Sequence, residues 1–410
     1  MAVIHPFRAL RPPAELVAQV ASVPYDVVNT EEARALAAGN PWSFLHVSRP
    51  EIDLPPGTDA YSEEVYKKAA NNFRELIERC PLKMEQEPSL YLYRLIMDDE
   101  EQIGVVACCS VNEYDNDKIL KHEKTRPEKE DDRTRHILAL RAQTGPVFLT
   151  YRSNQTIDTM VMETTITEAI YDFRAPDGVE HTIWHVPDPV RFVQAFRDVP
   201  KFYIADGHHR AASASRARKE LQTLNEQEHT GDEEYNFFLA VLFPSEQLKM
   251  LPYNRTVRDL NELSPEEFLH EVERRFDVVE GARATPEGRG HWSMYLRGRW
   301  YGLTRKDDGV ASSDDPVASL DVSILQENLL DPILGIKDVR TDKRIDFVGG
   351  IRGTQELERL VNEEQAAVAF SLSPTTIDDL LRVSDAGSVM PPKSTWFEPK
   401  LRDALLIHSI

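Results

Sequence analysis

Hydrophobic and polar residues follow two different periods along the chain, and each period predicts one kind of element. In residues 59–80 apolar side chains recur every three to four positions, which predicts an amphipathic helix. Residues 89–97 and 102–111 are strand-like and are joined by an acidic turn, so they predict a β-hairpin. Residues 128–143 predict a second helix, stopped by a Gly-Pro pair.

Prolines divide the first 58 residues of the chain. They leave room for one short helix near residues 30–38 and otherwise predict extended chain laid over a core. A strand, turn and strand are expected around residues 175–178, and a helix follows at residues 188–198.

The pattern restarts in the second half of the chain. Residues 235–243 and 251–256 look like paired strands, and beyond them a helix is expected at 264–276 and aromatic-rich strands at 292–303. Mixed strands and helices indicate an α/β or α+β architecture. A chain of 410 residues is too long for one compact core, so we expect two domains, residues 1–256 and 257–410.

Charge limits the classes of partner. Acidic side chains outnumber basic ones by 69 to 48, which gives a formal net charge of -21. Such a surface repels phosphate backbones and anionic membranes, so we expect neither nucleic acid nor a membrane as a partner. The three cysteines form no C-x-x-C motif and no apolar leader segment opens the chain, which favours a reducing, cytoplasmic location.

Residues 202–217 join an apolar run to an alanine-rich helix through Asp206 and Gly207. A glycine permits a tight turn, the free N–H groups of a helix start point outward, and the macrodipole favours negative charge there. The segment therefore predicts an anion site. The first helical turn adds three side chains to it: His208, His209 and Arg210.

These side chains add chemistry that bare backbone lacks. Arg210 can bind phosphate or carboxylate oxygens, and His208 and His209 can donate hydrogen bonds or protons. Asp206 can hold a metal or accept a proton. The plainer alternative is an ordinary helix start, with Asp206 as the N-cap and the histidines packed or solvated.

The charged run at residues 121–133 is a second candidate. Its plainer interpretation is a solvated loop. His122 and Glu123, followed by Thr125 and Arg126, instead indicate a functional site. Arg126 stands where the second histidine of an H-E-x-x-H zinc site would be, so that site is disfavoured. A carboxylate beside cations suits proton abstraction near a phosphate.

Three further segments place polar residues in loops shaped by proline, around Tyr25 and Asp26, around His46, and around Lys393. Each has a structural alternative as a packed turn, a buried strand or a docking segment. Each is equally suited to contact a substrate.

Six segments carry a resemblance to a known family: Pro24-Tyr-Asp26, Ser43-Phe-Leu-His46, His122-Glu123-Lys-Thr125-Arg126-Pro, Asp206-Gly-His-His-Arg210, Leu251-Pro-Tyr-Asn-Arg255 and Met390-Pro-Pro-Lys-Ser-Thr-Trp-Phe397. Together they resemble the DUF1015 family of bacterial and archaeal proteins, over essentially the whole chain. The Asp-Gly-His-His-Arg segment is also similar to that of free L-serine kinases. Those enzymes have a ParB/sulfiredoxin-like fold, in which this turn and the helix after it bind nucleotide phosphates.

The resemblance implies a ParB/sulfiredoxin-like nucleotide-binding core and an additional α/β region toward the C-terminus. It implies a phosphotransferase that uses ATP or ADP, with Mg²⁺, to phosphorylate the hydroxyl of a small metabolite, free L-serine first. The implied catalytic residues are Glu123 as base, Asp206, which also binds the metal, and His209. The expected phosphate contacts are Gly207, His208, Arg210, Arg126 and Thr125. The expected substrate contacts are Tyr25, Asp26, His46, His122 and Lys393.

Two alternatives from other classes stay open. A ParB-like regulatory or DNA-partitioning protein is disfavoured by the charge of -21 and by the lack of a basic helix-turn-helix. A metal-dependent hydrolase would use His208, His209 and Asp206, but adjacent helical residues diverge by ~100°, so two such histidines fit one metal poorly. The acceptor, the choice between ATP and ADP and the oligomeric state stay open, with a homodimer as one option.

Overall fold

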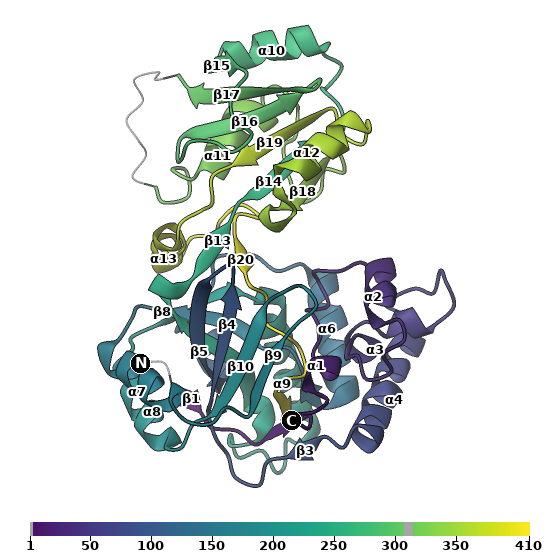
Figure 1. Ribbon diagram of the computed structural model, residues 1–410, viewed down its shortest axis with the longest axis vertical. Helices are drawn as coiled ribbons and strands as arrows, with labels where there is room; N and C mark the ends of the chain where they lie inside the picture. The colour runs from purple at the N-terminus through teal and green to yellow at the C-terminus, as the bar shows by residue number, and fades with distance from the viewer. Residues whose placement is uncertain (1–2, 307–314) are drawn as a thin grey trace. The chain divides into compact units, whose positions relative to one another are not determined.

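The computed structural model describes residues 3–306 and 315–410 (Figure 1). Its contacts divide the chain into two compact units. Unit 1 contains Met1–Lys121, Thr125–Leu248 and Pro399–Ile410, and unit 2 contains His122–Lys124 and Lys249–Glu398. Strands and helices mix in both units, which confirms the expected mixed α/β class. None of the described helices combines the length and apolarity needed to cross a membrane.

Unit 1 is built on a nine-stranded sheet. Its order is β6-β11-β8-β12-β5-β4-β10-β9, and β1 also pairs with β5. β8 and β12 run parallel, as do β6 and β11, while the other pairs are antiparallel. The strands are β1 (Ile4–His5), β4 (Tyr91–Met97), β5 (Glu100–Ser110), β6 (Ile119–Leu120), β8 (Val147–Tyr151), β9 (Tyr171–Arg174), β10 (Glu180–His185), β11 (Phe202–Asp206) and β12 (Phe237–Pro244).

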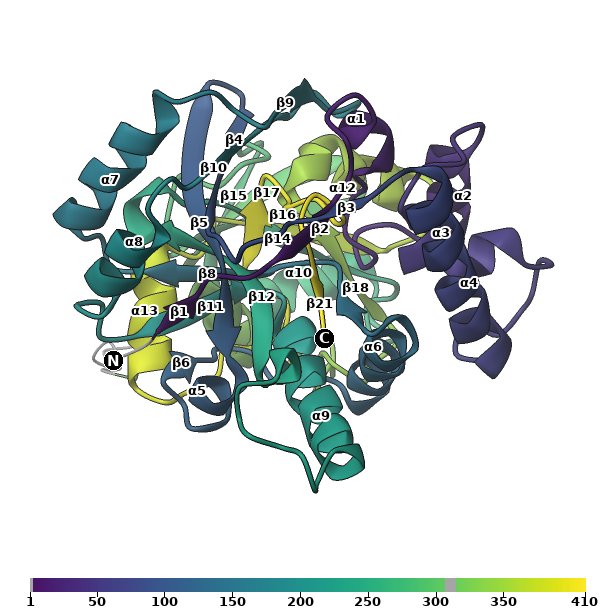
Figure 2. The same cartoon turned by 90° about the horizontal axis from the view of Figure 1, so that it is seen from below.

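Helices pack against this sheet. α7 lies beside α8, and α6 lies beside α9 (Figure 2). Apolar side chains of β5, β8, β11 and β12 pack with those of α7, α8 and α9 in one buried cluster. The helices of this part are α4 (Glu63–Arg79), α5 (Val111–Asp115), α6 (Pro127–Leu140), α7 (Gln155–Thr165), α8 (Pro189–Phe196) and α9 (His208–Leu224).

A smaller, four-stranded sheet ties the two ends of unit 1 together. Its order is β3-β2-β21-β7. The strands are β2 (Ala9–Arg11), β3 (Lys83–Met84), β7 (Ala142–Gln143) and β21 (Ile407–Ser409). The C-terminal strand therefore belongs to unit 1, although the whole of Lys249–Glu398 precedes it in the chain.

Unit 2 has a six-stranded sheet in which every described pair is antiparallel, in the order β15-β17-β16-β19-β14-β18. A two-stranded ladder joins β13 to β20. The strands are β13 (Lys249–Leu251), β14 (Tyr253–Val257), β15 (Phe276–Glu280), β16 (His291–Leu296), β17 (Arg299–Arg305), β18 (Ile345–Gly349), β19 (Val368–Leu372) and β20 (Trp396–Glu398). The helices are α10 (Pro265–Glu273), α11 (Asp321–Leu325), α12 (Gly353–Asn362) and α13 (Ile377–Asp385).

The expectation for the first 58 residues is only partly right. The expected helix is present as α2 (Thr30–Ala37), capped by Asn29 in a capping box. Two more helices of one turn, α1 (Val17–Val20) and α3 (Leu45–Ser48), and a 3₁₀ turn at Pro50–Asp53 were not expected. The prolines lie outside these short helices or, at Pro50, at the first position of the 3₁₀ turn, where proline costs little.

The expected pairing of strands 235–243 and 251–256 is wrong. β12 is hydrogen-bonded to β5 on one side and to β8 on the other, so it offers no edge to the next strand. β14 instead pairs with β18 and β19.

The helix expected at 128–143 is too long. α6 ends at Leu140 because Arg141 takes a left-handed conformation, with φ 52° and ψ 39°, and closes the helix. The next two residues then form β7.

Candidate functional site

The turn between β11 and α9 has a conformation that glycine adopts most easily. Gly207 has φ 93° and ψ 29°, which is left-handed. A Cβ at this position would lie 2.9 Å from Nε of Arg210, so the turn also lacks room for a larger side chain. The apolar residues of β11 before Asp206 are buried, which fixes the turn to the end of a central strand.

α9 begins without a side-chain cap among the described residues, and its N-cap position is Gly207. The alternative in which Asp206 caps the helix is therefore wrong. Asp206 Oδ1 accepts from the N–H of Gly207 at 2.8 Å instead. The first turn contains two histidines and an arginine and no carboxylate. A helix start of this kind favours an anion, because its N–H groups and its dipole both present positive charge.

Asp206 is held between two cations. Its Oδ2 lies 3.2 Å from Nζ of Lys400 and 3.6 Å from Nη2 of Arg210. Burial alone would raise the pKa of Asp206, but the charges of Lys400 and Arg210 outweigh it and hold that pKa well below its ordinary value. Asp206 is therefore ionised, and its first partners are protein cations.

Arg210 is packed into unit 1. Its side chain is 11% exposed, and its Nη1 donates to the carbonyl of Pro146. Among the described residues, none accepts a hydrogen bond from its buried Nε. Burial would lower the pKa of Arg210, but the carboxylates of Asp206, Asp26 and Asp403 outweigh it and raise that pKa. The guanidinium thus stabilises the turn as part of a buried charge cluster.

The two histidines of the turn have different surroundings. His208 is buried. Nε2 of His209 accepts a hydrogen bond from the backbone N–H of Arg126 at 3.0 Å, so this nitrogen carries no proton. That bond brings the segment of Thr125 and Arg126, which sequence analysis singled out separately, to the start of α9. The Arg126 side chain is half exposed, and Thr125 donates to Glu130.

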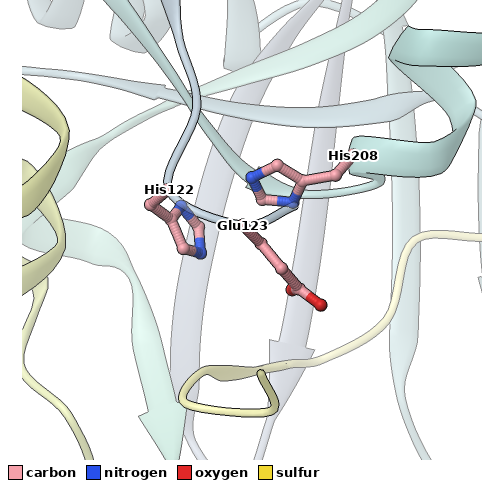
Figure 3. Close-up of side chains that lie close together, drawn as sticks. All are labelled: His122, Glu123 and His208. Atoms are coloured by element: carbon pink, nitrogen blue, oxygen red, sulfur yellow. The ribbon is translucent and has the colours of Figure 1, made fainter. Parts of the chain in front are cut away.

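Possible metal ligands come from the loop before Thr125. Residues His122–Lys124 are grouped with unit 2, although unit 1 flanks them on both sides in the chain. One ligand atom each of His122, Glu123 and His208 lies within 4.8 Å of the others (Figure 3). The hydrolase ligand set of His208, His209 and Asp206 is not gathered into such a group among the residues that the structure describes.

Tyr25 and Asp26 lie near Arg210. Tyr25 is buried, with the Arg133 guanidinium 4.0 Å from its ring centroid, whereas Asp26 is exposed. A cavity of about 40 Å³ is lined by Tyr25, Arg133, Arg210 and Asp403, among others. Burial, reinforced by the neighbouring Asp26, raises the pKa of Asp403 to about 7, although Arg210 and Arg133 act to lower it.

Lys400 and Asp403 were not expected from the sequence, and Arg133 was expected only as part of the charged run at residues 121–133. The available signal was weak: Lys400, Arg402 and Asp403 are charged residues in a short, mostly apolar C-terminal stretch. Such residues are buried only where they find partners, and those partners lie far away in the sequence.

His46 lies in a different part of unit 1. Its Nδ1 is 2.8 Å from Asp53 Oδ1, and this hydrogen bond is the main reason why the pKa of His46 is raised. It lines a pocket of about 580 Å³ beside Trp42 and Lys68, and residues 206–210 are not among the described lining residues. Lys393 belongs to unit 2, where it has φ 59° and its Nζ lies 5.3 Å from the ring centroid of Tyr253.

The raised pKa of Asp403 predicts a pH effect on stability. The folded protein keeps the Asp403 proton up to about pH 7, whereas the unfolded chain releases it near pH 4. The unfolded state therefore binds fewer protons in this window, so the Asp403 contribution to the free energy of unfolding falls as pH rises from about 4 to 7.

Urea unfolding of wild type and Asp403→Asn at several pH values measures this contribution as the difference between the two curves. The wild type should lose stability relative to the variant as pH rises. Asp99→Asn, in an exposed turn, is the control and should run parallel to wild type. Parallel curves for Asp403→Asn as well would contradict the assignment.

The chain has similarity to one described family and to solved structures. The sequence profile of the family described as "Protein of unknown function (DUF1015)" matches residues 4–323. No curated protein matches the sequence.

Three solved structures resemble the chain at low identity. A conserved hypothetical protein from Pyrococcus furiosus is 13% identical, with a TM-score of 0.36, over 74% of this chain and 94% of that chain. A free serine kinase in complex with AMP is 11% identical, with a TM-score of 0.36, over 74% and 92%. SbnI with a C-terminal truncation, from Staphylococcus aureus, is 12% identical, with a TM-score of 0.39, over 73% and 87%.

Proposed function

The chain belongs to the DUF1015 family, whose function is unknown, and we propose from its own site that it is a phosphotransferase. It would move a phosphoryl group from ATP or ADP to the hydroxyl of a small metabolite, with free L-serine as the first acceptor to test. The nucleotide phosphates would bind at the start of α9.

The uncapped start of α9 is the observation that carries this proposal. Its first turn has no side-chain cap among the described residues and no carboxylate, and Lys400 and Arg210 flank the carboxylate just before it. Phosphoryl transfer depends on positioning and on neutralising the charge of the phosphates rather than on covalent chemistry by the protein. In an acidic molecule, this turn supplies local positive charge from backbone and side chains together.

The remaining roles follow from position and chemistry. In the transfer step the acceptor oxygen forms a bond to the terminal phosphorus of the nucleotide, and the bond from that phosphorus to the bridging oxygen breaks. The acceptor proton passes to the carboxylate of Glu123, and ADP or AMP leaves. Arg126, whose side chain is half exposed and whose N–H donates to His209, would contact phosphate oxygens, and Thr125 would help to hold its loop.

Arg210 takes a different role from the one implied by the resemblance. Its guanidinium is occupied by Pro146 and Asp206 and is nearly buried, so we assign it to holding the turn in shape. Tyr25 and Asp26, which lie near Arg210, remain our candidates for the acceptor side of the site. His46 and Lys393 stay expectations from the sequence.

Magnesium fits the residues of this site only in part. Mg²⁺ prefers six oxygen ligands, usually waters, substrate phosphates and one or two carboxylates. The group of His122, Glu123 and His208 offers two nitrogens and one carboxylate, a set that suits zinc or a transition metal better. Asp206 has two cations as neighbours. We therefore expect nucleotide oxygens to supply most of the Mg²⁺ ligands.

The same group favours a metal-dependent hydrolase as the second candidate function. Two histidines and a carboxylate leave positions open for water on a catalytic zinc ion. Elemental analysis of protein purified without chelator separates the two candidates. Stoichiometric zinc, iron or manganese would favour the hydrolase, and the absence of these metals would favour phosphoryl transfer.

The proposal predicts a specific product. Pure protein incubated with Mg²⁺, ATP or ADP and a panel of hydroxyl-bearing metabolites should yield a phosphorylated metabolite, detected by mass, and AMP or ADP in equal amount. L-Serine is compared with L-alanine, which has the same backbone groups and no hydroxyl. Loss of nucleotide phosphate without any phosphorylated metabolite would instead indicate a hydrolase.

A further inference from the structure

The C-terminal segment Pro399–Ile410 is firmly fixed in unit 1. The N–H of Asp403 donates to the carbonyl of Ser22, and the N–H of Ala404 donates to the carbonyl of Thr144, both at 2.9 Å. β21 then pairs with β2 and β7. Backbone bonds thus hold this segment on both sides, and side-chain bonds add to them.

Arg402 supplies the side-chain anchor. It is 5% exposed, and its guanidinium pairs with Asp177 and donates from Nε to Nε2 of His181 at 3.2 Å. Nδ1 of His181 lies 2.8 Å from the hydroxyl of Tyr93, which also accepts from the N–H of Arg402. Since its Nε2 accepts a bond, His181 is neutral, in line with a pKa lowered to about 3 by burial and by Arg402. This network fixes the backbone two residues beyond Lys400.

Lys400 thereby lies at the start of α9. The carboxylate of Asp206 links the lysine to this helix start: its Oδ2 lies 3.2 Å from the Lys400 ammonium, and its Oδ1 accepts from the N–H of Gly207 at 2.8 Å. The lysine side chain is 14% exposed. An ammonium has three donors and acts as a point charge, which suits it to phosphate. Asp206 therefore orients a cation beside a helix start that has no side-chain cap among the described residues.

We propose that Lys400 binds the terminal phosphates of the nucleotide, so that the C-terminal segment completes the site in unit 1. This inference rests on the proposed function. It adds a binding residue that lies beyond the stretch matched by the family, residues 4–323. The competing explanation is that Lys400 only neutralises the buried charge of Asp206.

Nucleotide titrations of Lys400→Met test the inference. We expect the affinity for ADP and ATP to fall about 10- to 100-fold, the range for a lost charge-assisted hydrogen bond, and the affinity for adenosine to stay unchanged. Lys400→Arg should keep part of the affinity because it keeps the charge. Lys201→Met is the matched control, since this exposed lysine precedes the other end of β11.

A double variant separates phosphate binding from neutralisation. If Lys400 only neutralises Asp206, removing both charges in Lys400→Met/Asp206→Asn should restore ADP affinity to that of Asp206→Asn alone. If Lys400 binds phosphate, the double variant should stay at least 10-fold weaker than Asp206→Asn. Cooperative unfolding of each variant in urea confirms that it is folded before its affinity is compared.

The wild-type titration comes first and keeps the two claims apart. If wild type binds neither ADP nor ATP, the proposed function fails, and this inference fails with it. If wild type binds both, but Lys400→Met binds them equally well or loses adenosine to the same extent, the inference alone is overturned.

Discussion

Glu123→Gln is expected to leave nucleotide affinity within a few-fold of wild type and to lower the rate of phosphoryl transfer about 10²- to 10⁴-fold, the usual contribution of a positioned general base. The substitution keeps the shape of the side chain and removes its charge and basicity. A loose phosphoryl-transfer transition state needs the base to orient the hydroxyl and to accept its proton late. Removing the base should therefore lower the transfer rate and not the nucleotide affinity.

The measurement pairs a nucleotide titration with steady-state transfer kinetics on the same preparation. Glu87→Gln is the control, because this exposed carboxylate lies between β3 and β4 and has no assigned role. Near-full turnover of Glu123→Gln would place the base elsewhere, with Asp206 or Asp26 next to be tested. Loss of nucleotide binding would instead make Glu123 a metal ligand.

Arg210→Met is expected to lower the free energy of unfolding by about 3 to 5 kcal/mol, the cost of breaking a buried ion pair from one side. The variant leaves Asp206 and Asp403 in unit 1 without the guanidinium that faces both, and it removes the donor to Pro146. Urea unfolding at pH 7 measures the loss.

Arg216→Met is the matched control on the same helix. Arg216 is 36% exposed and pairs with Asp131 at 3.0 Å, so its removal should cost at most about 1 kcal/mol. Equal losses for the two variants would contradict the structural role given to Arg210. If Arg210→Met instead keeps its stability and loses nucleotide, the guanidinium binds phosphate directly.

Local patterns predicted local elements well. The amphipathic period of residues 59–80 corresponds to α4, and the acidic turn corresponds to a hairpin in which Asp98 and Asp99 take positive φ between β4 and β5. The apolar run, glycine and helix at 202–217 are present as β11, Gly207 and α9. In each case the sequence pattern and the element that it predicts involve the same few neighbouring residues.

Long-range partners could not be predicted in this way. Lys400 and Asp206 are separated by 194 positions, and their contact depends on the C-terminal segment returning to unit 1. The partners of β12 were missed for the same reason, since a strand pattern specifies which face is apolar but not which strand lies alongside. The Asp206–Arg210 turn was found because its residues are contiguous, whereas the cations that surround it were not.

The contacts of Arg210 could not be predicted from the sequence either. A guanidinium in the first turn of a helix suggests a phosphate ligand, but the structure folds this side chain back along Gly207 to Pro146. The glycine that allows the turn also makes room for the arginine. The sequence alone does not distinguish an arginine that faces a ligand from one whose side chain packs against its own turn.

A crystal structure of wild type with ADP would show whether nucleotide phosphates bind at the start of α9. We expect phosphate oxygens within hydrogen-bond distance of the backbone N–H groups there, with the ammonium of Lys400 turned from Asp206 toward the terminal phosphate. Nucleotide bound elsewhere in the molecule, with this turn unchanged, would contradict this expectation.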